Sequence, residues 1–252
     1  MRLKGKTALI TGGTLGIGKA TAKLFIEQGA DVFICGRNQE VGQNAAEELG
    51  CTYSRLDVSD RQAVQVWIEE VFGKTGRIDI LVNNAGITRD GLLVKVKDGE
   101  LVKQLAEEDF DLVVSVNLKG TFNCTQAAAP YMINQGSGSI INASSVVGLD
   151  GNFGQTVYVA TKAGIVGMTK VWAREFGRFN VRVNAIAPGS IQTDILESMP
   201  EKFLTELKKH QPLGRFGTPE EVASATLFLA SDDASFVSGA TLRVDGALVL
   251  GT

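Results

Sequence analysis

Histidine and cysteine are scarce in this chain of 252 residues, and their scarcity excludes several kinds of site. The single histidine, His210, excludes a metal centre built from several histidines. The three cysteines (Cys35, Cys51 and Cys124) lie far apart without a C-x-x-C pair. That spacing argues against a disulfide framework or a thiolate metal site and fits a reducing compartment. If the chain is an enzyme, another type of side chain must move its protons.

Clustered charge and long apolar runs are also missing. The 25 basic and 28 acidic side chains give a net charge of -3 without a basic run, which argues against a nucleic-acid partner. No apolar run approaches the roughly 20 residues of a membrane helix, and no signal-peptide pattern follows Met1. We therefore expect a cytoplasmic protein that binds neither nucleic acid nor membrane and holds no metal.

What the chain does contain is a regular alternation of short apolar runs and longer amphipathic segments. The runs predicted as strands are 7–11, 31–35, 78–82, 139–143, 181–187 and 240–244. The segments predicted as helices are 17–28, 38–49, 59–72, 110–133, 157–179 and 218–230. The alternation predicts a single α/β domain over 1–252, with a parallel sheet covered by helices on both faces.

Cap patterns support three of these helix starts. They are Asn38 before a helix that Gly50 closes, the capping-box spacing Ser59-x-x-Gln62, and Thr218-Pro-Glu-Glu221. Residues 92–108 (LLVKVKDGELVKQLAEE) interrupt the alternation and are expected to form a lengthened loop or helix. Two interpretations of this segment stay open, a flap at the entrance to a site and a solvated surface excursion.

A glycine cluster at 11–18 (TGGTLGIG) joins the first strand to the first helix. Gly12, Gly16 and Gly18 have the spacing G-x-x-x-G-x-G, which differs from the general dinucleotide pattern G-x-G-x-x-G. Glycines here let the chain turn sharply and let a pyrophosphate approach backbone amides at a helix N-terminus. The cluster therefore predicts a dinucleotide site.

Five motifs in order give a resemblance to the short-chain dehydrogenase/reductase family. They are the glycine cluster, Asn83-Asn-Ala-Gly86, Asn117 in S-V-N-L-K-G, Ser145 thirteen residues before Tyr158-x-x-x-Lys162, and Pro188-Gly189. The resemblance covers essentially the whole chain. It implies a Rossmann-type doubly wound fold with a seven-stranded parallel sheet flanked by helices on both faces.

The spacing of Tyr158 and Lys162 suggests a proton-transfer pair without histidine. Four residues apart on a helix, they share one face, and a nearby ammonium is expected to lower the pKa of the phenol. Tyr158 then exchanges a proton with a carbonyl or alcohol oxygen, while Ser145 donates a hydrogen bond to that oxygen. In the family, the position of Asn117 helps to hold a water chain that relays protons through the lysine.

The end of the second predicted strand indicates which nicotinamide cofactor is used. Gly36 stands where NAD-selective relatives often carry aspartate, and Arg37 can reach a 2′-phosphate, so NADP(H) is favoured and NAD(H) stays possible. The candidate cofactor contacts are Gly12, Thr14, Leu15, Gly16, Ile17, Gly18, Arg37, Asp57, Val58, Asn84, Ala85, Gly86, Tyr158, Lys162, Pro188, Gly189, Ile191 and Thr193.

The substrate is less closely defined. Within the family, the chain looks most like 3-oxoacyl-thioester reductases, by the stretch 145–155 and the ending Val-Asp-Gly246. A secondary alcohol dehydrogenase or ketone reductase is the alternative, and a binding protein without activity is disfavoured because Ser145, Tyr158 and Lys162 are intact. A carrier-protein partner stays open. The resemblance also implies a variable substrate lid over about 189–215 and a homotetramer.

Overall fold

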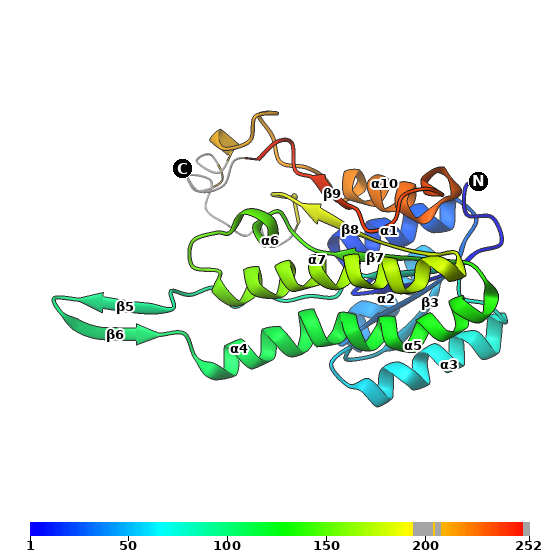
Figure 1. Ribbon diagram of the computed structural model, residues 1–252, viewed down its shortest axis with the longest axis horizontal. Helices are drawn as coiled ribbons and strands as arrows, with labels where there is room; N and C mark the ends of the chain where they lie inside the picture. Colours follow the sequence, from blue (N-terminus) through cyan, green and yellow to red (C-terminus); the bar gives the residue numbers. More distant parts are fainter. Residues whose placement is uncertain (194–203, 205–207, 249–252) are drawn as a thin grey trace.

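Seven parallel strands form one sheet in the order β3-β2-β1-β4-β7-β8-β9 (Figure 1). The computed structural model describes residues 1–193, 204 and 208–248. The strands are β1 (Thr7–Thr11), β2 (Asp31–Gly36), β3 (Thr52–Arg55), β4 (Ile80–Asn83), β7 (Gly138–Ala143), β8 (Val181–Pro188) and β9 (Thr241–Val244). The chain adds β2 and β3 on one side of β1, then returns to add β4, β7, β8 and β9 on the other. This confirms the doubly wound fold.

Helices cover both faces of the sheet, as the alternation predicted. On one face lie α1 (Gly16–Glu27), α2 (Gln39–Leu49) and α10 (Pro219–Ala230). On the other lie α3 (Arg61–Thr75), α5 (Gly120–Gln135) and α7 (Thr156–Phe176). In β1, Ala8 and Ile10 face the first core while Leu9 faces the second. Because alternate side chains enter two different cores, β1 is buried throughout and apolar at its three central positions.

The cap patterns predicted two helix starts correctly and one wrongly. Asn38 accepts a hydrogen bond from the amide of Val41, and Thr218 forms a complete capping box. Ser59 does not cap α3; the carboxylate of Asp60, one residue later, accepts from two amides at 3.0 Å. Ser59 donates instead to Asp57. The helix also continues past the predicted end at 72 to Thr75, where Gly76 adopts a left-handed conformation.

Several other boundaries differ from the prediction. The strand predicted at 78–82 is β4, Ile80–Asn83, and the short edge strand β3 had no predicted bounds. The long helix predicted at 110–133 begins earlier, with α4 (Glu107–Val113). It continues through a π-helical turn, η1 (Val114–Lys119), into α5. Two short 3-10 turns, η2 (Gly177–Phe179) and η3 (Asp232–Ala234), follow α7 and α10, and α6 (Val147–Asp150) precedes α7.

The segment predicted as a loop or helix at 92–108 is a β-hairpin for most of its length. Strands β5 (Val94–Lys97) and β6 (Glu100–Gln104) pair antiparallel outside the main sheet. Asp98 and Gly99 join them, with φ of 54° and 83°. Positive φ at both positions is the mark of a type I′ turn, which Asp-Gly favours. The alternation of valine and lysine before this turn is a strand pattern.

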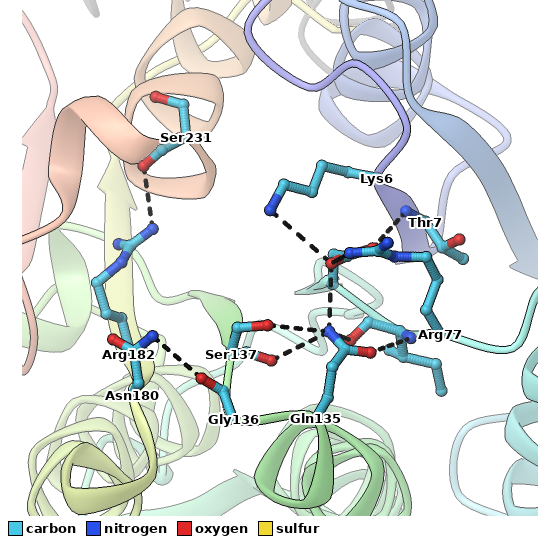
Figure 2. A network of polar contacts seen from close by, with 11 residues as sticks. Lys6, Thr7, Arg77, Gln135, Gly136, Ser137, Asn180, Arg182 and Ser231 are labelled. Atoms are coloured by element: carbon cyan, nitrogen blue, oxygen red, sulfur yellow. Dashed lines mark hydrogen bonds and ion pairs between the residues drawn. The ribbon is translucent and has the colours of Figure 1, made fainter.

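A polar network occupies the amino ends of the central strands (Figure 2). The buried carboxylate of Asp79 accepts from the amide of Thr7 and from the guanidinium of Arg77, each at 2.7–2.8 Å. The side chain of Gln135 donates to the same carboxylate and to the backbone of Ser137. Charge-assisted bonds of this kind join the amino ends of β1 and β4 to the end of α5.

Two sequence expectations concern other parts of the chain. The expected lid at about 189–215 lies partly outside the described residues. His210, near the end of this range, is exposed. Among the described residues, no helix is long and apolar enough to cross a membrane.

Candidate active site

The glycine cluster forms a tight turn between β1 and α1. Gly12 and Gly16 have positive φ, at 63° and 51°, a region that favours glycine. A Cβ on Gly18 would lie 2.1 Å from the carbonyl oxygen of Gly12, so only glycine fits there. The cluster thus presents bare backbone at the start of α1, where the helix dipole favours an anion.

A second loop, after β4, is tied to the glycine cluster by hydrogen bonds. The hydroxyl of Thr11 accepts from the amides of Asn84 and Ala85, both at 3.0 Å. The side chain of Asn84 donates to the carbonyls of Thr11 and Gly12. Asn84 therefore positions the two loops relative to each other. Because β1 and β4 are neighbours at the point where the strand order reverses, the two loops border the crevice where doubly wound sheets bind ligands.

A cavity of about 580 Å³ opens at this crevice. Its lining joins the two loops to the carboxyl ends of β7 and β8 and to the start of α7. The lining residues named as site candidates from the sequence are Gly12, Leu15, Gly16, Ile17, Asn84, Ala85, Gly86, Ser145, Tyr158, Lys162, Pro188, Gly189, Ile191 and Thr193. A cavity of this size is within the range of small-molecule and cofactor sites.

Tyr158, Lys162 and Ser145 meet in this cavity. Lys162 is only 4% exposed, and its ammonium lies 5.5 Å from the centre of the Tyr158 ring. The ammonium donates to the carbonyl of Ala143 at 2.7 Å, at the end of β7. Ser145 follows that strand; its hydroxyl donates to the carbonyl of Pro188 at 3.5 Å and lies near enough to Tyr158 to lower the pKa of the phenol. The neighbouring Ser144 is buried and donates to the backbone carbonyl of Lys162 at 2.8 Å.

Asn117 is fully buried and lies in the π-helical turn η1. Its amide oxygen accepts from the backbone amide of Ile87 at 2.8 Å, and its nitrogen donates to the carbonyl of the same residue at 2.9 Å. A Cβ on Gly86 would lie 3.3 Å from Asn117 and 3.5 Å from the ammonium of Lys162. The nitrogen of Asn117 also donates to the hydroxyl of Thr161 at 3.3 Å, so Asn117 holds the loop after β4 against α7. Single π-helical turns often occur at functional sites.

The ionisation of the site differs from the expectation drawn from spacing. Burial lowers the pKa of Lys162 from 10.5 to about 8. The pKa of Tyr158 is raised, not lowered, because burial outweighs the hydrogen bond from Ser145, and the carboxylate of Asp90 raises it further. The ammonium of Lys162, which was expected to lower the pKa of Tyr158, is not among the groups that shift it. Desolvation of a phenol inside a cavity is not visible in the i, i+4 spacing.

Five of the candidate cofactor contacts do not line the cavity. They are Thr14, Gly18, Arg37, Asp57 and Val58. Gly18 packs closely against the carbonyl oxygen of Gly12 at the start of α1. Val58 is buried against Gly120. Thr14 packs on Gly36 at the end of β2, and Arg37 is exposed beside them.

The cavity fits a nicotinamide dinucleotide by its shape and its backbone. Glycines stand where a side chain would fill the cradle, at the turn after β1 and again at Gly86. Ser145, Tyr158 and Lys162 line the same cavity as the glycine turn that would receive the phosphates. We find that the residues present match the requirements of such a cofactor.

Sequence reasoning assigned no role to several residues that support this site, although one of them, Asn83, begins a recognised motif. Asn83 donates to Thr125 and Asn142, and Asn142 donates to Thr169, which links β4 and β7 to α5 and α7. Asn83 and Asn142 are paired in register on neighbouring strands. The sequence shows an asparagine near the end of each of two apolar strands. It does not show that these two asparagines are in contact, because that depends on the strand order.

The mouth of the cavity has a further polar pair that sequence reasoning missed. Gln155 lines the cavity and donates to the carboxylate of Asp90 at 2.9 Å. Asn152 donates to Gln155 in turn. These side chains join the loop after β4 to the start of α7.

Comparison with known proteins adds two findings. A family model described as Enoyl-(Acyl carrier protein) reductase matches residues 12–248. The chain is 51% identical to the 3-oxoacyl-[acyl-carrier-protein] reductase FabG of Thermotoga maritima, over 99% of this chain and 100% of that protein. Proteins of the same name from Chlamydia trachomatis and Staphylococcus aureus are 45% and 41% identical, over 98% and 97% of this chain and 98% of each relative.

Proposed function

This chain belongs to the short-chain dehydrogenase/reductase family, and we propose that it reduces the 3-oxo group of an acyl thioester to a 3-hydroxyl group with NADPH. As a member, it is an NAD(P)H-dependent oxidoreductase. The observation that carries the proposal is the single cavity in which the glycine turn, Ser145, Tyr158 and Lys162 come together. Relatives named for 3-oxoacyl reduction at 41–51% identity support the choice of substrate class.

The chain's own residues supply binding, polarisation and a proton. A bound nicotinamide supplies the hydride that the carbonyl carbon receives. Ser145 and Tyr158 line one wall of the cavity and donate hydrogen bonds to the carbonyl oxygen. Tyr158 then gives its proton to that oxygen as negative charge develops there. The Lys162 ammonium lies beneath the ring and stabilises the phenolate that remains.

The ionisation of the site provides a protonated donor at neutral pH. A raised pKa keeps Tyr158 protonated at neutral pH, which is the form that a proton donor requires. A pKa of about 8 keeps Lys162 mostly charged there as well. Both groups are therefore in the protonation state that carbonyl reduction needs.

The proposed preference for NADPH rests on the end of β2. A Cβ on Gly36 would lie 3.0 Å from the methyl group of Thr14, so an aspartate at this position would require the Thr14 side chain to shift slightly. Without that aspartate, the three residues directly after β2, Arg37, Asn38 and Gln39, carry no carboxylate to repel a 2′-phosphate. The exposed guanidinium of Arg37 supplies a positive charge at the same place.

Assembly and location are part of the proposal. The outer surfaces of α5 and α7 carry exposed apolar side chains, among them Phe122 and Val171. We infer that these helices pair in a homotetramer, which sedimentation equilibrium would test. The near-neutral charge and three unpaired cysteines support a cytoplasmic location.

A substrate panel tests the proposal. NADPH oxidation is followed at 340 nm with acetoacetyl-CoA, acetoacetyl-carrier protein, and cyclic and aromatic ketones. We expect the two thioesters to have the highest kcat/KM and NADPH to be preferred over NADH. A higher kcat/KM for a ketone without a thioester would assign the alternative, a secondary alcohol dehydrogenase. No turnover with any of them would contradict the proposed reaction.

A further inference from the structure

The hairpin β5–β6 and the start of α4 form an arm, residues 92–112, that stands away from the rest of the subunit (Figure 1). Every residue of both strands is exposed. The following helix buries only Val113 of its seven residues. The arm therefore has almost no packing against its own subunit.

The hairpin has two chemically different faces. Val96 lies opposite Leu101, and Lys95 lies opposite Lys103. Successive side chains of β5 point to opposite faces, and a register shift between these two pairs lets Leu101 and Lys103 follow them to opposite faces. One face is therefore apolar, and the other is mainly basic, with Glu100 opposite Lys97. Val96 and Leu101 are 59% and 56% exposed.

An isolated hairpin of this kind is poorly stabilised. Two-stranded hairpins are marginal in water unless a third element covers their apolar face. Lysines directly opposite each other on neighbouring strands repel and destabilise the pair. A partner that covers the Val96–Leu101 face and brings carboxylates to Lys95 and Lys103 would relieve both problems.

The arm itself carries the carboxylates that such a partner needs. The first turn of α4 contains Glu107 and Glu108, together with Asp109, which pairs with Arg89 of its own subunit at 3.5 Å. A basic hairpin followed by an acidic turn is self-complementary when two copies pair about a two-fold axis. An acidic carrier protein or an anionic bilayer would instead meet these carboxylates and be repelled. The charge pattern thus favours a second copy of this chain over either of those partners.

We propose that the arms of two copies pack against each other about a two-fold axis. The apolar hairpin faces cover one another, and the lysines of each copy face the acidic turn of the other. The base of the hairpin adjoins the cavity mouth, because the amide of Gly91 donates to the carbonyl of Gly154 at 2.8 Å and the next residue, Gln155, lines the cavity. The pairing therefore places a subunit contact beside the substrate entrance.

Photo-crosslinking tests this contact directly in the full-length protein. Leu101 is replaced by p-benzoylphenylalanine, and the control carries the same group at Val66, an exposed valine on α3. We expect position 101 to give a covalent dimer whose crosslink maps to residues 92–112 of the other copy. A monomer after irradiation, or a crosslink mapping elsewhere, would overturn the proposal. So would capture of added acyl carrier protein in preference to a second copy.

A charge swap tests the pairing of lysines with the acidic turn. In the chain that carries the photoreactive group at 101, Lys95→Glu with Lys103→Glu should lower the covalent yield at least tenfold. Adding Glu107→Lys and Glu108→Lys should restore it, because both signs are then exchanged. An unchanged yield in the first variant, or no recovery in the second, would contradict the proposed arrangement.

Discussion

Replacing Lys162 by methionine should change how the stability of the protein depends on pH. The Lys162 side chain is 4% exposed, and burial lowers its pKa from 10.5 to about 8. At about 1.4 kcal/mol per pKa unit, keeping this ammonium in the folded protein costs about 3 kcal/mol. A charge held at that cost is typical of an active site.

The direction of this pH dependence follows from the number of protons that the folded and unfolded states bind. Below pH 8 Lys162 is protonated in both the folded and the unfolded chain, so the folded protein bears the full cost of the buried ammonium. Between pH 8 and 10.5 the folded chain releases it first, and stability rises with pH. Wild type should therefore gain about 1.4 kcal/mol per pH unit relative to Lys162→Met across this window. Loss of the hydrogen bond to Ala143 adds an offset that does not alter the slope.

Urea unfolding at fixed subunit concentration measures this difference at pH 7, 8, 9 and 10. The control is Lys170→Met, an exposed lysine farther along the same helix. We expect the curves of wild type and Lys162→Met to be parallel below pH 8 and to diverge above it. The control should follow wild type throughout. Parallel curves for Lys162→Met up to pH 10 would show that the ammonium is not desolvated and would refute this reasoning.

Three further predictions concern the cofactor and the pH dependence of the reaction. Arg37→Ala should raise the KM for NADPH by about 10–100-fold with little change for NADH, because a charge-assisted hydrogen bond contributes about 1.5–3 kcal/mol; equal effects on both cofactors would argue against phosphate binding. Gly18→Ala should weaken NADPH binding, measured by fluorescence titration, about 10–100-fold, because the added Cβ would lie 2.1 Å from the carbonyl oxygen of Gly12. The control Gly73→Ala, whose Cβ would enter open space, should bind NADPH as tightly as wild type. In steady-state assays, kcat/KM for reduction should fall as pH rises through about 8, where Lys162 loses its charge; a flat profile to pH 9 would contradict that role.

The architecture could be predicted from the sequence because its signals are local. Strands buried on both sides read as apolar runs, and Thr218 and Asn38 were identifiable as caps by residue type. The hairpin at β5–β6 also had a local signal, Asp98-Gly99 between alternating residues, but the segment was interpreted as a loop or helix. The error at Ser59 arose because the stronger acceptor, the Asp60 carboxylate, follows immediately.

The site was predictable only where its parts are close in sequence or follow a family motif. Tyr158 and Lys162 share a helix face by spacing alone, and the structure places them together. The link between Asn83 and Asn142 depends on β4 pairing with β7, which no local pattern specifies. The pKa of Tyr158 was predicted in the wrong direction, because burial is a property of the assembled fold.

The central claim is that Tyr158 protonates the carbonyl oxygen in a cavity shared with the cofactor. Single-turnover oxidation of bound NADPH by acetoacetyl-CoA tests it in Tyr158→Phe, which keeps the ring and loses only the hydroxyl. NADPH affinity, measured by fluorescence, should stay close to that of wild type. The rate constant should fall by about 10²–10⁴, the usual contribution of a general acid. A variant that binds NADPH normally and reacts within about twofold of the wild-type rate would contradict the account.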